Sequence, residues 1–409
     1  MMESKRKVPE IRFAGFEGEW SNFTLSNFAD RITRKNVTLE SDLVMTISAH
    51  HGLISQSEFF NKRIASTNIS GYYLMKHGEF TYNKSYSTSY PWGAVKRLDR
   101  YDKGVVSNLY IVFEAHDIVS DFLVTYYDTN KWHKEVAIRA KEGARNHGLL
   151  NISADDFLST SFVIPKESSE QEKIGELFSE LTSQIAAQII YCEKLRNLKA
   201  SLLASLLPQG KEAKPRVRLD GFTEDWTEKS LDEIITPYKE IVETPHDGYE
   251  RLGIRSHGKG TFHSYVPKGA ELETAQMSVV RPNNLIVNIT FGWELAVAVT
   301  EPNDEGKLVS HRFPQFSFKE ENTPIFFRYA LINNRFRKHL TLASPGSAGR
   351  NRVLKIDKML EYKMLVPSNK EQKAISDILS EYDNLIQLNE QKLEKLRNLK
   401  QAMLDKMFV

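Results

Sequence analysis

Several segments of the chain combine basic, aromatic and small hydroxyl side chains, a mixture that suits contact with nucleic acid. Lysine and arginine neutralise phosphates, and arginine or asparagine can bind a purine edge through two hydrogen bonds. Candidates in the first half are Lys84, Tyr86, Ser87, Tyr90, Trp92, Lys96, Arg97, Arg145 and Asn146. Candidates in the second half are Arg255, His257, Lys259, Trp293, Arg350, Asn351 and Arg352. Ordinary polar surface loops have the same residue types, so both interpretations stay open at this point.

Sequence motifs for catalysis are missing. There is no His-Glu-x-x-His, no Gly-x-Ser-x-Gly and no Gly-x-Gly-x-x-Gly that opens a helix. The nearest approach is the segment from Gly253 to Gly260, which has the glycine spacing of a phosphate-binding loop. Gly260 stands where such a loop needs serine or threonine, and residues 261–266 are predicted to form a strand instead of a helix. We therefore expect neither a nucleotide site nor catalysis in this chain.

Cysteine and histidine usage argues against a metal centre. Cys192 is the only cysteine in the sequence, which excludes an internal disulfide and a cysteine-based zinc site. His50 and His51 are the only adjacent histidines, and neighbours on a strand point to opposite faces. No structural metal is expected.

Composition is that of an ordinary water-soluble protein. The 409 residues suffice for two or three domains, and 41% of them are hydrophobic. No apolar run approaches the length of about 18 residues that a membrane span needs, and no signal peptide is visible. A cytoplasmic protein without membrane contact is predicted. The net charge of +2 and the pI near 8.3 are only weakly suggestive of a polyanionic partner.

An internal repeat organises the whole sequence. The segment with Gly15, Phe16 and Trp20 recurs as Gly221, Phe222 and Trp226. Residues 193–199 (EKLRNLK) recur letter for letter as residues 394–400. Weaker echoes lie between these ends in the same order, so the chain is a duplication.

The two halves match at their ends and diverge in their middles, roughly residues 40–140 and 245–345. One interpretation is that the middles are simply rich in loops. The other is that the ends form a scaffold while the middles perform different versions of one task. Strands are predicted at residues 43–47, 109–113, 285–289 and 295–299, and helical stretches at 119–129 and 325–340, which makes each middle an α+β domain.

A long helix is predicted to follow each middle. Residues 168–171 and 368–371 look like capping boxes. Apolar residues with a spacing of seven then define one row in each helix: Ile174, Leu181, Leu195 and Leu202 in the first, and Ile375, Tyr382, Leu396 and Met403 in the second. Gln188 and Asn389 interrupt these rows, and an amide at an inner position typically fixes the pairing register of helices. The alternative is that both amides face solvent.

The expected fold is therefore α+β, with two recognition domains separated by two long antiparallel coiled-coil helices and an internal pseudo-two-fold repeat. The boundaries are residues 1–165 for the first recognition domain, 166–210 for the central helix, 211–367 for the second recognition domain and 368–409 for the C-terminal helix. At about 1.5 Å per residue, the central helix spans on the order of 55 Å.

Taken together, these features resemble the specificity subunits of type I restriction-modification systems. The resemblance rests on the repeated Gly-Phe-x-x-x-Trp openings, the variable middles and the two helices that end in EKLRNLK. The strand motif 78–84 and its weaker counterpart 283–289 add to it, and the match covers the whole chain.

This resemblance implies two target recognition domains, each reading one half of a bipartite, asymmetric sequence in double-stranded DNA. The helices would set the spacing and dock two methyltransferase subunits, which restriction (motor-nuclease) subunits would join. This chain would be non-catalytic and bind no cofactor, while S-adenosylmethionine, ATP and magnesium would belong to the partners. The Asn-Pro-Pro-Tyr/Phe motif of such methyltransferases is absent from the sequence. The repeat and the helices alone would equally fit a coiled-coil scaffold that presents two protein-interaction domains and never binds DNA.

Overall fold

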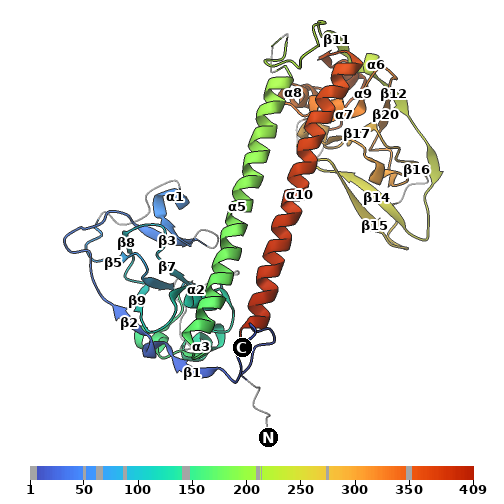
Figure 1. Cartoon of the computed structure of the whole chain (residues 1–409). Coiled ribbons are helices and arrows are strands. Elements are labelled where there is room, and N and C mark those ends of the chain that lie inside the picture. The colour runs from blue at the N-terminus through green and yellow to red at the C-terminus, as the bar shows by residue number, and fades with distance from the viewer. Residues whose placement is uncertain are drawn as a thin grey trace. The chain divides into compact units, whose positions relative to one another are not determined.

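The computed structural model divides the chain into two units, and each unit contains parts of both long helices. Unit 1 comprises residues 1–190 and 391–409, and unit 2 comprises residues 191–390. The structure describes residues 7–48, 52–60, 68–85, 90–140, 148–208, 212, 214–272, 276–346 and 352–409. Helix α5 (Ser168–Leu206) begins in unit 1 and ends in unit 2, whereas α10 (Asn369–Met407) begins in unit 2 and ends in unit 1 (Figure 1).

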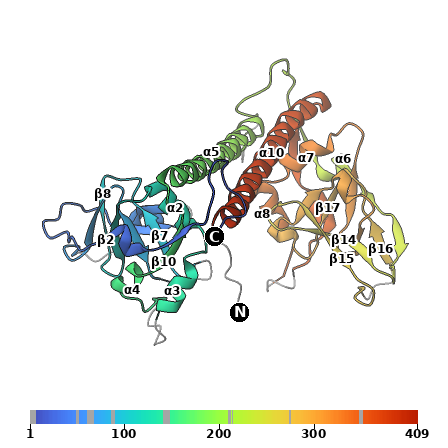
Figure 2. The same cartoon turned by 60° about the horizontal axis from the view of Figure 1, so that its bottom comes forward.

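The recognition domain of unit 1 is built on the antiparallel sheet β2-β9-β6-β7, with the smaller pairs β1-β10, β3-β4 and β5-β8 beside it (Figure 2). Its elements are β1 Ser21–Thr24, η1 Leu25–Asn27, β2 Ala29–Ile32, β3 Met45–Ser48, β4 Gly52–Ser55, α1 Gln56–Phe60, β5 Tyr73–Lys76, β6 Phe80–Asn83, β7 Ala94–Arg97, β8 Lys103–Val106, β9 Ile111–Ala115, α2 Ser120–Asp128, α3 His133–Arg139, α4 Ala154–Leu158 and β10 Ser161–Ile164. Phe80 and Phe113 from paired strands stack at the centre of the core.

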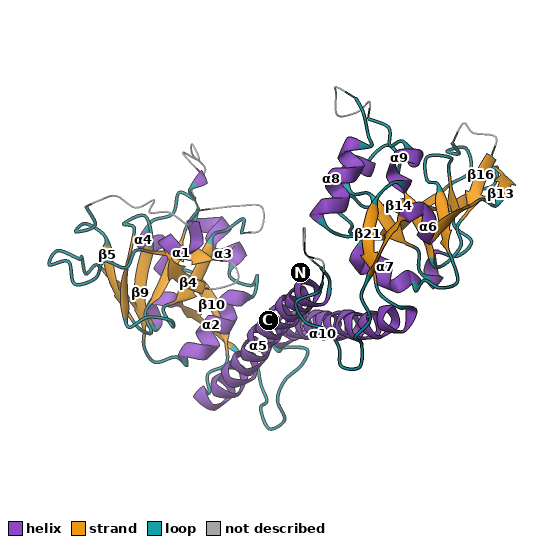
Figure 3. Ribbon diagram, turned by 90° about the horizontal axis from the view of Figure 1, so that it is seen from above, coloured by secondary structure: helices purple, strands orange, loops and turns teal. Residues whose placement is uncertain are grey.

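The recognition domain of unit 2 repeats this plan, with one five-stranded sheet where unit 1 has the separate pairs β3-β4 and β5-β8. The sheet β12-β20-β17-β18 and the pair β11-β21 correspond in chain order to β2-β9-β6-β7 and β1-β10. The sheet β13-β16-β19-β14-β15 stands at the places in the chain that β3, β4, β5 and β8 have in unit 1 (Figure 3). Its elements are β11 Thr227–Ser230, α6 Leu231–Ile234, β12 Ile235–Tyr238, β13 Ile241–Glu243, β14 Tyr249–Ile254, β15 Thr261–Val266, β16 Gln276–Val279, β17 Asn284–Val287, η3 Gly292–Glu294, β18 Val297–Val299, η4 Pro302–Asp304, β19 Leu308–Val309, β20 Gln315–Phe318, α7 Pro324–Ala330, α8 Asn334–Leu342, α9 Ile356–Leu360 and β21 Lys363–Val366. The duplicated α+β architecture predicted from the sequence is confirmed.

The two long helices pack antiparallel. In unit 2, Lys199 of α5 pairs with Asp383 of α10, and one turn earlier in α5 Arg196 pairs with Glu390, which lies further along α10. In unit 1, Phe178 and Leu181 from the start of α5 share a core with Leu404 and Phe408 from the end of α10. Among the described residues, no helix is long and apolar enough to cross a membrane.

The start of each long helix is held by a buried carboxylate. Arg12 donates two hydrogen bonds of 2.8 Å to Glu170, which is 2% exposed, and Trp20 Nε1 donates a third to the same side chain at 3.3 Å. In unit 2, Arg218 donates two hydrogen bonds of 2.9 Å to Glu371, which is 1% exposed. A two-pronged guanidinium is the partner best suited to a carboxylate withdrawn from water.

The next residue joins each helix to its recognition domain. Gln171 accepts a hydrogen bond from Val119 N at 3.0 Å and donates one to Pro165 O at 2.8 Å. Gln372 accepts from Thr323 N at 2.8 Å and donates to Pro367 O at 3.0 Å. The capping boxes predicted at these positions are therefore wrong, because Gln171 and Glu371 are engaged by the recognition domains.

Two further expectations need correction. The stretch 325–340 forms two helices instead of one, because Asn333 starts α8 by accepting a hydrogen bond from Phe336 N at 2.8 Å. In α10 the predicted inner row is only partly buried: Ile375 is buried, but Tyr382, Leu396 and Met403 are partly exposed, while Leu379, Leu393 and Leu404 are buried. The buried face of α10 is set by the recognition domains at its ends, which a heptad pattern does not include.

An ion triad ties the end of α10 to the recognition domain of unit 1. Asp128, at the end of α2, accepts hydrogen bonds from Lys96 at 2.7 Å and from Lys400 at 2.9 Å. Burial disfavours the charged carboxylate, but attraction to the two ammonium groups and their hydrogen bonds outweigh that effect and lower the Asp128 pKa.

We predict that Asp128→Asn destabilises unit 1 in a pH-dependent way. At pH 7 the loss should be about 1–3 kcal/mol, because two partly buried ammonium groups lose their anionic partner. A lowered folded-state pKa means that the contribution is complete above the unfolded pKa of about 4 and disappears as the pH falls through the folded-state value. Urea unfolding of the full chain from pH 7 to pH 3 should therefore show the two proteins converging in acid.

The matched control is Asp42→Asn, which removes an exposed carboxylate from the same unit. It should leave stability unchanged across the series. A constant difference between Asp128→Asn and the wild-type chain at every pH would contradict the ionic account.

Candidate nucleic-acid interface

The described candidates of unit 2 gather around the short helix η3. Arg255 and His257 lie on the turn between β14 and β15, and His257 N donates to Glu294 O at 2.8 Å. Ser256 Oγ donates to the Glu294 carboxylate at 2.6 Å, which fixes the turn against η3. Segments far apart in the sequence are thereby brought to one region.

Two arginines of this region stack on aromatic rings. The Arg352 guanidinium lies 5.4 Å from the ring centroid of Trp293, and that of Arg255 lies 5.2 Å from the ring centroid of Phe262. Stacking leaves guanidinium edges available for hydrogen bonds to phosphates or bases. Lys259, on the same turn as Arg255, is exposed.

The glycine-rich segment 253–260 is part of a hairpin. Residues from Tyr249 to Ile254 pair antiparallel with those from Val266 back to Thr261. A phosphate-binding loop requires a helix whose N-terminus faces the phosphates. The strand predicted at 261–266 is confirmed, and the segment lacks the geometry of a nucleotide site.

A hollow of about 700 Å³ opens beside η3. Phe262 and Phe291 line it and remain 38% and 42% exposed. The polar residues of its lining are Arg251, Ser256, Asn288, Glu294, Ser310, His311 and Arg312. Exposed rings together with arginine, asparagine and carboxylate groups are the side chains that contact base edges and methyl groups.

Sequence reasoning missed most of this hollow. Asn288, His311 and Arg312 come from two different loops, and single residues in loops carry no spacing signal. The one available hint was that His311 and Arg312, two polar side chains that can bind nucleic acid, are adjacent in the sequence.

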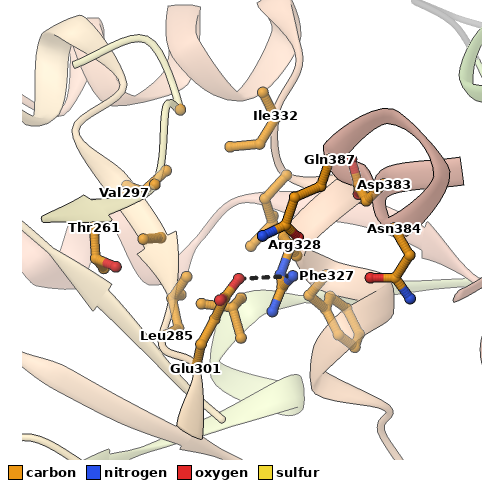
Figure 4. Close-up of a pocket in the computed structure, with 15 residues that line it drawn as sticks. Thr261, Leu285, Val297, Glu301, Phe327, Arg328, Ile332, Asp383, Asn384 and Gln387 are labelled. Carbon is orange, nitrogen blue, oxygen red and sulfur yellow. Dashed lines mark ion pairs between the residues drawn. The ribbon is translucent and has the colours of Figure 1, made fainter. Parts of the chain in front are cut away.

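A second hollow in unit 2, of about 360 Å³, is less suited to an anionic ligand. Arg328 of α7 and Glu301 point toward one another there and form an ion pair of 2.9 Å (Figure 4). Asp383 on the α10 side accepts from Tyr329 Oη at 2.7 Å and pairs with Lys199. Arg328, the cation that lines this hollow, is thus already neutralised by Glu301.

The described candidates of unit 1 are largely engaged within the protein. Lys96 belongs to the triad with Asp128, and Arg97 bonds to Asp99 at 2.6 Å and to Asp121 at 2.7 Å. Lys84 Nζ donates to Ile152 O at 3.4 Å. Trp92 packs against the core and its carbonyl accepts from Tyr82 Oη, while Tyr90 accepts a backbone hydrogen bond from Gly93.

Other candidates fall elsewhere. Tyr86, Ser87, Arg145, Asn146, Arg350 and Asn351 lie outside the described residues, as do His50 and His51. Gln188 is buried in α5 at 8% exposure, whereas Asn389 is partly exposed and donates to Leu385 O of its own helix at 2.7 Å. Within the described part of the chain, no three histidine, cysteine or acidic side chains cluster as metal ligands.

Comparison with known proteins agrees with this arrangement. Residues 260–398 match the family described as the type I restriction modification DNA specificity domain. The type I restriction enzyme MjaVIII specificity subunit of Methanocaldococcus jannaschii is 21% identical over 318 residues, which cover 74% of this chain and 73% of the relative. The crystal structure of the type I restriction-modification S subunit from M. genitalium shares the fold with a TM-score of 0.59 at 13% identity, covering 98% of this chain and 99% of that one.

The family resemblance inferred from the sequence is thereby confirmed. The matched family domain begins at the end of the hairpin turn and covers β15, η3 and most of α10, and it includes the candidates Trp293 and Arg352 but not Arg255, His257 or Lys259. Residues 260–398 thus match a type I restriction-modification DNA specificity domain, and the chain as a whole is similar to specificity subunits of such systems.

Proposed function

We propose that each recognition domain of this chain reads one half of a bipartite, asymmetric sequence in double-stranded DNA. One observation carries the proposal: the two units repeat the same sheet core and the same contacts at the helix starts, yet the strands beside that core form two separate pairs in unit 1 and one five-stranded sheet in unit 2. A common scaffold with unlike reading surfaces suits the recognition of two different half-sites by one chain. The functional modules are residues 1–165, 166–210, 211–367 and 368–409.

In this proposal the hollow beside η3 contacts base edges, and the stacked arginines Arg255 and Arg352 contact phosphates or bases around it. The support is chemical. The hollow combines exposed rings with arginine and asparagine, and both arginines are oriented by aromatic partners.

The long helices would set the distance between the half-sites and dock two methyltransferase subunits, which restriction subunits join. Exposed apolar side chains support a docking role. In unit 2 they are Tyr191, Leu198, Leu385 and Leu388, the last of them 61% exposed. Methylation with S-adenosylmethionine, and ATP- and magnesium-dependent cleavage, would take place on the partners, and this chain would be non-catalytic and bind no cofactor.

Salt-dependent binding distinguishes a DNA reader from a protein scaffold. We predict that the full chain binds duplex DNA with an affinity that falls by about tenfold or more between 50 and 200 mM salt, because phosphate contacts release counterions. Fluorescence anisotropy with labelled duplexes measures it. Salt-insensitive or absent binding, even with the methyltransferase partner present, would favour the scaffold.

Exchange of one recognition domain tests the division of labour. Replacing residues of about 40–150 with the equivalent segment of another specificity subunit should change one half of the methylated motif and preserve the other. The matched exchange of about residues 245–345 should change the opposite half. Methylome sequencing of cells that carry each chimaera reads both halves, and a change in both halves from a single exchange would refute modular reading.

A single substitution tests the hollow. Arg312→Gln should relax base preference within one half-site, because a paired arginine contact to a base contributes about 1–3 kcal/mol of discrimination. Arg216→Gln, which removes another exposed arginine from unit 2, should leave the motif unchanged. An unaltered methylated motif in the Arg312 variant would exclude that residue from reading.

A further inference from the structure

Helix α8 of unit 2 presents a cationic face that the motifs of the sequence did not reveal. Its nine residues, NRFRKHLTL, include Arg335, Arg337 and Lys338 and no carboxylate. Successive residues turn by about 100°, so Lys338 and Leu342 lie opposite Phe336 and Leu340, with Arg335 on one flank of this exposed side and Arg337 on the other. Phe336 and Leu340 are fully buried, whereas all three cations are exposed and Leu342 is 83% exposed.

The position of α8 is fixed by contacts to the region of the candidate interface. Phe336 and Leu340 anchor it in the core of unit 2. Thr341 Oγ1 donates to Trp293 O at 3.3 Å, which joins α8 to η3, and the same tryptophan carries the stacked Arg352. Helix α8 therefore packs against η3, which also contributes Glu294 to the lining of the hollow.

The charges of this face are not neutralised within the described part of the protein. None of the three cations forms an ion pair there, and Arg335 stacks 5.7 Å from the ring centroid of Tyr362. In unit 1 the helix at the same place in the element order is α3, and its Arg139 is bound by Glu135 at 2.6 Å. Burial opposes ionisation of Glu135, but hydrogen bonds from Ser161 and Arg139 lower its pKa and keep that carboxylate charged.

We propose that the exposed face of α8 binds the phosphate backbone of double-stranded DNA beside the base-reading hollow. Three cations that form no ion pair among the described residues, spread across the exposed side of one helix, suit contacts with neighbouring phosphates, and such contacts add affinity and orientation without sequence preference. Because α3 neutralises its own arginine, unit 2 anchors the backbone through this helix and unit 1 does not. The inference rests on the proposed DNA-reading function.

The test removes two of these cations from the full chain. Arg337→Gln/Lys338→Gln should weaken binding to a 30-base-pair duplex of arbitrary sequence by roughly tenfold or more at 100 mM salt. The slope of log affinity against log salt should become shallower by about 1.8, since each lost phosphate contact contributes about 0.9. The loss should be equal on two unrelated duplexes. Both side chains are exposed, so thermal unfolding of the chain should be unchanged.

The matched control is Lys239→Gln/Lys268→Gln. It removes the same charge from two exposed positions of unit 2 outside α8, Lys239 between β12 and β13 and Lys268 just after β15, and should leave the salt slope at its wild-type value. A second control, Lys134→Gln on α3, should do the same.

The outcomes separate this inference from the function on which it rests. If the wild-type chain binds duplex DNA in a salt-dependent way but the α8 variant retains its full slope, the role of α8 is refuted and the proposed function stands. Loss of methyltransferase association with unchanged DNA binding would assign α8 to a protein contact and also refute it. A wild-type chain that binds no duplex overturns both.

Discussion

Two buried carboxylates, one at the start of each long helix, impose the constraint on which the rest of the molecule depends. A carboxylate withdrawn from water costs several kcal/mol unless it is paired and hydrogen-bonded. Glu170 and Glu371 therefore require Arg12 and Arg218, which lie just before the repeated Gly-Phe segments. These two ion pairs hold the repeated opening motif of each half against the start of a long helix.

Each recognition domain is joined to a long helix at one of these two anchors. Gln171 and Gln372 bond to the backbone that begins α2 and α7, so each helix start and its recognition domain share one hydrogen-bonded junction. In unit 1, which contains the start of α5, the chain just after the end of α10 joins the same core: Phe408 packs on Trp20 and Phe122. Loops that stand on so rigid a base can present side chains with little freedom to lose on binding.

Local charge pairing, and not net charge, distinguishes the two units. Lys96 and Arg97 of unit 1 serve the protein's own carboxylates, whereas Arg337 and Lys338 of α8 face solvent on a helix without acidic residues. A net charge of +2 conceals this difference because it averages cations that hold the fold together with cations that are available to a ligand.

The sequence by itself determined the duplication, the α+β class, the two long helices and the absence of catalytic motifs. Each of these follows from the spacing of residues close together in the chain or from direct comparison of the two halves. Only the tertiary structure decided which candidates meet. Trp293 and Arg352 come together at η3. Lys96 instead pairs with Asp128, which also binds Lys400 from near the end of the chain. The physical reason is that a side chain's availability depends on long-range neighbours, and periodicity records only neighbours within a few residues.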